Sequence, residues 1–162
     1  MTHTIIDSPI GQLTLVGDGG ALTGVFMPDH QPAPDPVCFG ARDDAAFADA
    51  VLQLGEYWAG ERTAFELDLA PVGSAFQQGV WAALREIPFG ETRTYGWIAA
   101  RIGHPAAVRA VGLANGRNPL SIVVPCHRVV SSSGALTGYA GGVERKRFLL
   151  DHEAGARLDS VA

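Results

Sequence analysis

The tripeptide Pro71-Val72-Gly73 divides the chain into two parts that differ in periodicity and in charge. Before it, short β-rich runs alternate with turns, whereas after it apolar residues recur at the spacing of helices. Residues 1–72 carry two basic residues against eleven acidic ones, a net charge of −9, and residues 73–162 carry ten against six, a net charge of +4. We therefore expect an α+β chain of two domains, residues 1–72 and residues 73–162.

The first part is expected to form a small sheet covered by one helix. Three β-rich runs separated by Gly, Pro and Asp turns have the pattern of a hairpin or meander, and they span residues 4–7, 11–16 and 22–27. A proline-rich loop follows, and apolar residues at helical spacing then predict a helix over about residues 44–59. We expect a further strand over residues 65–69.

The second part predicts several helices, two of which have the spacing of a helix-turn-helix. Ser74 and Gln77 form a capping box that begins the first helix. A helix over residues 95–102 and another that begins at Pro105 and runs to about residue 115 are separated by a glycine turn. A β-branched run at residues 121–124 and a last helix over residues 143–152, with Phe148 and Leu149 facing inward, complete this part.

The charge of the second part indicates a polyanionic partner. Eight basic residues and a single acidic residue lie between Arg93 and Arg147, a net charge of +7. A concentration of this kind is typical of a surface that binds nucleic acid. The alternative is that these side chains are solvated and balance the acidic first part.

The helix expected from Pro105 has one nearly bare face. Small side chains allow such a face to approach a DNA groove closely, and a single arginine can then enter the groove. The alternative is an alanine-rich core helix with one surface arginine. The outward face consists of Ala106, Arg109, Ala110 and Leu113. The face expected to pack inward consists of Val108, Val111 and Gly112.

The sequence Pro125-Cys126-His127-Arg128 is a candidate reactive site. A thiol reacts as its thiolate, which nearby imidazole and cationic groups favour. Neighbouring side chains on a strand point to opposite faces, so His127 reaches Cys126 only if Pro125 breaks the strand into a turn or a water relays the proton. Glu153 on the last helix is the candidate to orient the histidine. The alternative is an inert buried cysteine.

A glycine-rich loop with one aromatic residue, Gly138-Tyr139-Ala140-Gly141-Gly142, follows the cysteine, and Tyr95 begins the first helix of the expected pair. Such a loop lets backbone donors approach a flat ligand while the ring lines a wall, and a phenol can donate a proton. Together with a helix-turn-helix and a reactive thiol, these features indicate chemistry on a flipped base.

The sequence resembles the O6-alkylguanine-DNA alkyltransferases, also called methylated-DNA–protein-cysteine methyltransferases, from about Phe76 to Glu153. The resemblance implies a ribonuclease-H-like α/β domain in residues 1–72 and a helix-turn-helix/winged-helix, DNA-binding and alkyl-acceptor domain in residues 73–162. The matching strings are Phe76-Gln77-Gln78-Gly79-Val80-Trp81, Ile87-Pro88-Phe89-Gly90-Glu91-Thr92, Arg109-Ala110-Val111-Gly112, Asn118-Pro119, Pro125-Cys126-His127-Arg128-Val129 and Gly138-Tyr139.

The same resemblance implies a role for each catalytic residue. Cys126 would displace the alkyl group from guanine O6, keep it as a thioether and act only once. His127, oriented by Glu153, would take the thiol proton through a water. Tyr95 would protonate guanine N3, and Asn118 would be the hinge that ties the helix pair to the cysteine turn.

The resemblance also implies where DNA and the base bind. Arg109 would fill the gap left by the extruded nucleotide, and the expected DNA contacts are Ala106, Arg109, Ala110, Leu113 and Arg128. The carbonyls of Cys126 and Val129 would accept from the guanine amine. Tyr139 would form a pocket wall, and the Ala140 amide would face O6. Ala140 stands where some relatives have serine, so that hydroxyl contact is lost.

The expected partner is double-stranded DNA containing alkylated guanine, with O4-alkylthymine left open as a further substrate. The two cysteines are too few for a disulfide framework or a zinc site, so we expect free thiols, no metal and no cofactor. The longest apolar run has five residues, which excludes a membrane span of about 18 residues. We expect a cytoplasmic protein, monomeric in solution and able to cluster on DNA.

Three alternatives stay open at this point. Alkyltransferase-like proteins that only bind alkylated bases commonly replace the nucleophile with tryptophan, whereas position 126 here is cysteine. A helix-turn-helix regulator with an incidental thiol would bind one DNA sequence specifically, unlike a repair protein. A cysteine hydrolase would need oxyanion donors beside Cys126, and the sequence indicates none.

Overall fold

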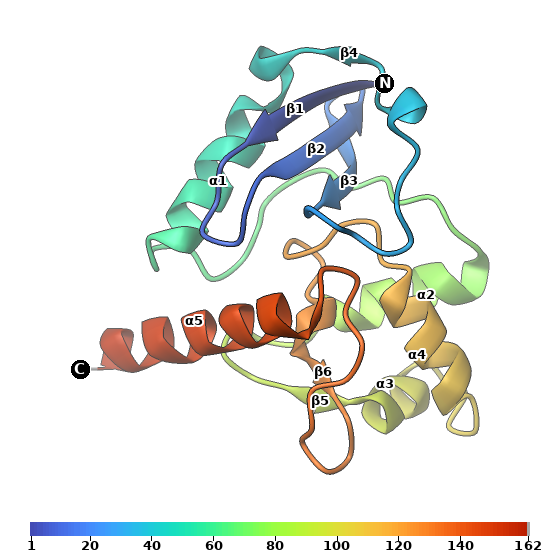
Figure 1. Ribbon diagram of the computed structural model, residues 1–162. Helices are drawn as coiled ribbons and strands as arrows, with labels where there is room; N and C mark the ends of the chain where they lie inside the picture. Colours follow the sequence, from blue (N-terminus) through green and yellow to red (C-terminus); the bar gives the residue numbers. More distant parts are fainter. Residues whose placement is uncertain (162) are drawn as a thin grey trace.

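Four strands of the first part form one sheet in the computed structural model, which describes residues 1–161, with side chains as far as Gly155. The sheet order is β3-β2-β1-β4, in which β1–β2 and β2–β3 pair antiparallel and β1–β4 pair parallel (Figure 1). The predicted meander is confirmed within a few residues at each end. The strands are β1 (Thr2–Ile6), β2 (Leu13–Asp18), β3 (Ala21–Phe26) and β4 (Ala41–Arg42).

One α-helix, α1 (Ala48–Trp58), covers a face of this sheet (Figure 1). A 3-10 turn, η2 (Asp44–Phe47), precedes it and accounts for the predicted start of the helix, and a further 3-10 turn, η1 (Pro36–Phe39), lies in the proline-rich loop. Phe47 and Leu54 are buried against strand residues of the core because they lie on one face of the helical segment.

The strand predicted over residues 65–69 is wrong. Its backbone is held by a side chain instead, because Gln53 of α1 accepts from the Glu66 N–H at 2.8 Å and donates to the Glu66 carbonyl at 3.0 Å. Only Leu69 pairs with the sheet, as an isolated bridge to Leu22. The alternating apolar residues are therefore packed as an extended segment beside α1 rather than as part of a ladder.

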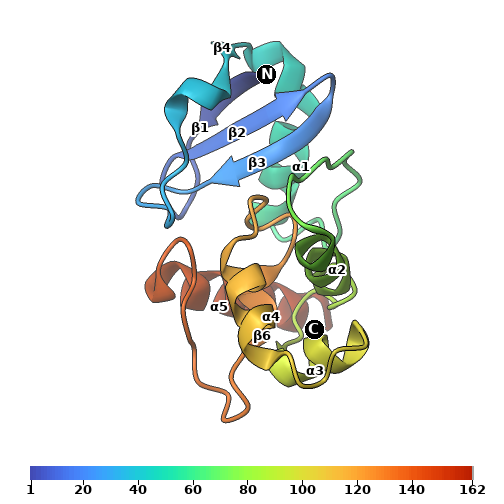
Figure 2. The ribbon, with the colours of Figure 1, turned by 90° about the vertical axis from the view of Figure 1, so that its right-hand side faces the viewer.

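The second part contains the predicted helices, stacked below the sheet (Figure 2). The capping box is confirmed, since Ser74 accepts from the Gln77 N–H and Gln77 accepts from the Ser74 N–H. Helices α2, α3 and α4 pack against one another, and a two-stranded parallel pair joins β5 to β6. The elements are α2 (Ala75–Leu84), β5 (Arg93–Thr94), α3 (Tyr95–Arg101), α4 (Val108–Gly116), η3 (Cys126–Arg128), β6 (Val129–Val130) and α5 (Val143–Val161).

Three local expectations for this part are corrected. Helix α4 begins at Val108 because a turn closed by the Ala107 N–H and the His104 carbonyl precedes it, and Val108 is 42% exposed rather than inward. Residues 121–124 form no strand, since Ile122 has a φ of 74° and the chain turns there. Of the two α5 residues expected to face inward, Leu149 is fully buried, while Phe148 is 42% exposed and stacks on His152.

The two parts share one buried core. Val25 of β3 donates its N–H to the Pro119 carbonyl at 2.8 Å, and the same apolar cluster contains Leu15 from the sheet and Val123 from the turn before Cys126. Both parts of the chain therefore contribute to the core that contains the turn before Cys126. In the portion that the structure describes, no helix is both long and apolar enough to cross a bilayer.

Candidate active site

Cys126 begins the 3-10 turn η3 and is 2% exposed. Pro125 precedes the turn, so the chain takes the first of the two arrangements that the sequence left open, a broken backbone rather than a regular strand. Asn118 braces this turn, because its Nδ2 donates to the Val124 carbonyl at 2.9 Å while its Oδ1 accepts from the Leu120 N–H at 3.0 Å. The one asparagine side chain thus fixes the backbone at Leu120 and at Val124, two residues before the thiol.

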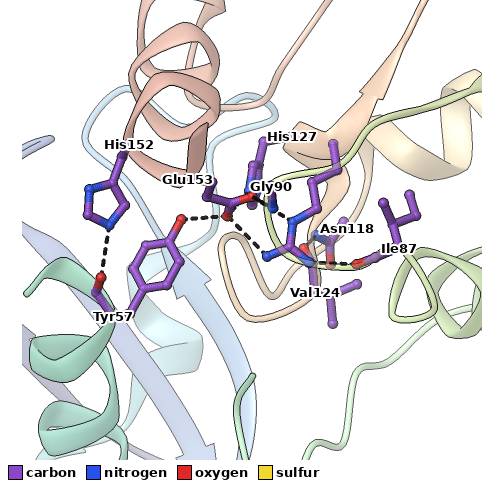
Figure 3. Close-up of polar contacts among 9 residues, drawn as sticks. Tyr57, Ile87, Gly90, Asn118, Val124, His127, His152 and Glu153 are labelled. Atoms are coloured by element: carbon purple, nitrogen blue, oxygen red, sulfur yellow. Dashed lines mark hydrogen bonds and ion pairs between the residues drawn. The ribbon is translucent and has the colours of Figure 1, made fainter. Parts of the chain in front are cut away.

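Glu153 lies at the centre of a buried network that reaches the cysteine turn (Figure 3). Its Oε2 is 2.7 Å from His127 Nε2, as the sequence predicts for a carboxylate that orients the histidine. Arg128 binds the same carboxylate with its Nε, 2.7 Å from Oε1, and with a second guanidinium nitrogen, 3.0 Å from Oε2. The Gly90 N–H lies 3.5 Å from Oε1. The carboxylate is therefore held by cationic, imidazole and backbone donors at once.

Arg128 is not at the DNA face, where we expected it. The side chain is buried at 6% exposure, and besides Glu153 it donates to the Ile87 carbonyl at 2.7 Å. A buried guanidinium requires a partner of opposite charge, and the carboxylate of α5 supplies it. The positive charge of Arg128 thus contributes to the interior of the site rather than to binding of a polyanion.

The protonation of the site follows from these contacts. Burial alone would raise the pKa of Glu153, but His127 and Arg128 hold it well below its ordinary value, so the carboxylate is ionised. Burial lowers the pKa of His127 despite the opposing effect of Glu153, so the imidazole is neutral. An ionised carboxylate only accepts, so Nε2 carries the proton, and His127 Nδ1, which has no hydrogen-bond partner, is the basic nitrogen.

Cys126 is a thiol in the resting protein. Burial raises its pKa to about 11, while Asn118 and the charge of Lys146 oppose that shift. A thiol with this pKa needs a base to react near neutral pH. The adjacent imidazole is a suitable base because its ionised partner Glu153 stabilises the imidazolium that would form.

The glycine-rich loop after the cysteine is fastened to the first part of the chain. The Gln31 N–H donates to the Ala140 carbonyl at 2.8 Å, and Arg145 donates to the carbonyls of Pro28 and Gly141 at 3.0 Å. A Cβ on Gly141 would lie 2.5 Å from the sulfur of Met27, so a larger residue there would require the Met27 side chain to shift. The loop is therefore held in one position next to the cysteine turn.

Both parts of the chain match one protein family. Residues 1–71 match the ribonuclease-like domain of 6-O-methylguanine DNA methyltransferase, and residues 75–155 match its DNA binding domain. The chain belongs to this family. The resemblance noted from the sequence is confirmed, and so is the expected fold of a ribonuclease-like part with a sheet followed by a helical DNA-binding part.

The relatives match nearly the whole length of this chain. The methylated-DNA–protein-cysteine methyltransferase of Mycobacterium tuberculosis (strain ATCC 25618 / H37Rv) is 55% identical over 151 residues, 93% of this chain and 91% of that protein. The enzyme of that name from Methanosarcina acetivorans is 51% identical over 154 residues, 94% and 98% of the two chains. The crystal structure of M. tuberculosis OGT in complex with DNA superposes with a TM-score of 0.90 at 52% identity, covering 96% and 94% of the two chains.

Four of the residues expected to contact DNA lie on or next to one helix. Arg109, Ala110 and Leu113 are exposed on α4, and Ala106 is exposed in the turn that leads into it. Leu113 is 73% exposed. Val111, on the opposite face, is fully buried as predicted. The helix therefore presents one small-residue face with a single long cation.

Tyr95, Tyr139 and Ala140, the residues expected to line the base pocket or protonate the base, differ in exposure. Tyr139 and Ala140 are buried in the loop, whereas Tyr95 at the start of α3 is half-buried, with its hydroxyl 2.8 Å from Thr137 Oγ1. Val129, which follows η3, donates its N–H to the Cys126 carbonyl. The Tyr95 hydroxyl therefore contacts the residue directly before the glycine-rich loop.

Two site residues escaped the sequence reasoning, Tyr57 and Lys146. Lys146 on α5 is fully buried, and its Nζ donates to the Thr137 carbonyl at 3.0 Å while its charge favours the thiolate of Cys126. Lys146 is the single lysine of the sequence, against eleven arginines. A lysine kept where every other basic residue is arginine could have indicated a specific role. Nothing in the sequence near Tyr57 distinguishes it from an ordinary core residue of α1.

Proposed function

We propose that this chain repairs O6-alkylguanine in DNA by direct transfer of the alkyl group to Cys126. The supporting observation is the hydrogen-bonded chain from Glu153 to His127, adjacent in the turn to a buried thiol. The close relatives named methylated-DNA–protein-cysteine methyltransferases, and the DNA complex of one of them, support the same reaction. A cytoplasmic location and a monomer able to cluster on DNA are part of the proposal, as is the division into domains at residues 72 and 73.

The reaction begins with a proton transfer within the site. His127 Nδ1 accepts the proton of Cys126 through a bridging water, and the resulting imidazolium is stabilised by ionised Glu153. The thiolate Sγ attacks the alkyl carbon in line as the bond from that carbon to guanine O6 breaks. The electron pair of that bond passes to the guanine ring, whose N3 takes a proton from the Tyr95 hydroxyl. No group in the site breaks the new thioether, so each molecule reacts once.

The base reaches the thiol only if it leaves the duplex. We propose that α4 enters a groove by its face of Ala106, Arg109, Ala110 and Leu113, and that Arg109 occupies the space of the extruded nucleotide. Asn118 ties that helix to the cysteine turn, since its N–H donates to the Asn115 carbonyl of α4 and its side chain bonds the backbone at Val124 and Leu120. The carbonyls of Cys126 and Val129, the ring of Tyr139 and the amide of Ala140 would surround the flipped guanine.

Intact-mass measurement tests the reaction directly. After incubation with a duplex containing one O6-methylguanine, the protein is expected to gain the mass of one methyl group, located by peptide mapping on the peptide that contains Cys126. The gain should saturate at one group per protein. Tight binding to the lesion without a mass gain would instead support a base-binding protein, and binding without lesion preference would support a helix-turn-helix regulator.

An Arg109→Ala variant is expected to repair duplex DNA about 10- to 100-fold more slowly, the equivalent of about 1.4–2.7 kcal/mol of lost stabilisation of the flipped state. Reaction with the free base O6-benzylguanine, which needs no flipping, should change less than about twofold. The measurement is the single-turnover rate with each substrate. The matched control is Arg117→Ala, which removes an exposed arginine from the other end of α4. Equal losses with both substrates would contradict a role for Arg109 in flipping.

A further inference from the structure

We infer that Tyr57, a residue of the first part of the chain, is a positioning residue for the Glu153–His127 pair. Its hydroxyl donates to Glu153 Oε2 at 2.7 Å (Figure 3). The same oxygen lies 2.7 Å from His127 Nε2, so the tyrosine and the histidine share one acceptor atom. Both Tyr57 and Glu153 are fully buried, so water does not compete for this contact. The inference rests on the proposed function, in which Glu153 stabilises the imidazolium.

The Tyr57 hydroxyl has little freedom to move away from Glu153. Its ring packs edge-on against Trp58 at 4.9 Å and against Phe89 at 6.1 Å, between ring centroids. Its backbone carbonyl is 2.8 Å from His152 Nε2, and His152 is the residue directly before Glu153 (Figure 3). Helix α1 is therefore joined to α5 by two hydrogen bonds at consecutive residues, and these fix where the carboxylate lies.

The hydroxyl acts only as a donor. Burial, reinforced by the charge of Glu153, raises the pKa of Tyr57 well above its ordinary value, so the phenol stays protonated. Arg128 donates hydrogen bonds to both carboxylate oxygens of Glu153, and the Tyr57 hydroxyl donates a further one to Oε2. Without the Tyr57 hydroxyl, we expect the Glu153 carboxylate to move toward the Arg128 guanidinium, which weakens its hydrogen bond with His127. The imidazolium–thiolate pair is then less stabilised.

A Tyr57→Phe variant tests this inference because it keeps the ring and removes only the hydroxyl. The single-turnover rate of methyl transfer to Cys126 is expected to fall about tenfold near neutral pH, the effect of weakening one charge-assisted hydrogen bond. The loss should shrink as the pH rises toward the Cys126 pKa of about 11, because the thiol then ionises without help from His127. A purely structural defect would lower the rate by the same factor at every pH. That result, or an unchanged rate, would overturn the inference.

A second readout needs no substrate. The proton on a histidine nitrogen bonded to a buried carboxylate resonates far downfield in the NMR spectrum, and that of His127 is expected to shift in Tyr57→Phe. An unshifted resonance would overturn the inference even if the protein transferred no methyl group. Conversely, a wild-type protein that gains no mass in the same assay would overturn the proposed function alone.

The matched control is Phe65→Leu. Phe65 packs on the Tyr57 ring with centroids 5.5 Å apart and is part of the same aromatic cluster, but it carries no polar group toward Glu153. This variant should lose packing and thermal stability while keeping the pH dependence and the His127 resonance of the wild type. A pH dependence in Phe65→Leu equal to that of Tyr57→Phe would overturn the inference, since loose packing would then explain both.

Discussion

A Cys126→Ser variant is expected to transfer no detectable alkyl group, with a loss on the order of 10⁶-fold, as is typical when a catalytic nucleophile is removed. The hydroxyl is a far weaker acid than the thiol, and a site that already holds the thiol pKa at about 11 cannot ionise it. Duplex binding should stay close to that of the wild type, because Cys126 is 2% exposed and the expected DNA contacts are the exposed residues of α4. Intact mass and a binding titration measure the two properties.

Cys38→Ser is the matched control, since it changes the other free cysteine. Cys38 is exposed in η1 of the first part and lies outside the network around Glu153. This variant should gain one methyl group as the wild type does. If Cys126→Ser kept the transfer and Cys38→Ser lost it, Cys38 would be the nucleophile and the mechanism would be contradicted.

The sequence predicted correctly the elements that are determined by residues close together in the chain. The capping box of Ser74 and Gln77 begins α2 as expected, because both bonds of the motif lie within four residues. The strands of the meander were predicted within a few residues for the same reason. Residues 65–69 and 121–124 have β-rich composition but no strand, since packing against the core, partial in the first segment and complete in the second, explains their apolar side chains.

The sequence predicted those site residues that are adjacent in the chain or whose proposed chemistry requires a partner. Cys126, His127 and Glu153 were placed together because a base beside a thiol needs a third group to orient it, and the described structure has that contact at 2.7 Å. Arg128 was misplaced because its ion pair depends on a carboxylate 25 residues away. Tyr57, 96 residues from Glu153, carries no pattern that sequence periodicity can detect.

A Glu153→Gln variant is expected to be less stable at neutral pH by roughly 3–5 kcal/mol, the usual cost of breaking a buried ion pair by removing one partner. The amide has no charge, so the guanidinium of Arg128 stays buried without a counter-ion. Urea denaturation at pH 7 measures this loss. The matched control is Glu144→Gln, which changes an exposed acid in the first turn of α5 and should alter the free energy of unfolding by less than about 0.5 kcal/mol.

The pH dependence of unfolding distinguishes the ion pair from a packing defect. The folded protein holds the pKa of Glu153 below its ordinary value of 4.5, so the carboxylate contributes stability that is fully present above that pH. As the pH falls through 4.5 and lower, the unfolded chain takes up a proton that the folded chain resists, and this stability is lost. The wild type should therefore approach Glu153→Gln in stability as the pH falls. If the difference in the free energy of unfolding between the two proteins stays constant down to pH 3, the charge of Glu153 does not stabilise the fold. The proposed stabilisation of the His127 imidazolium by that charge would then be contradicted.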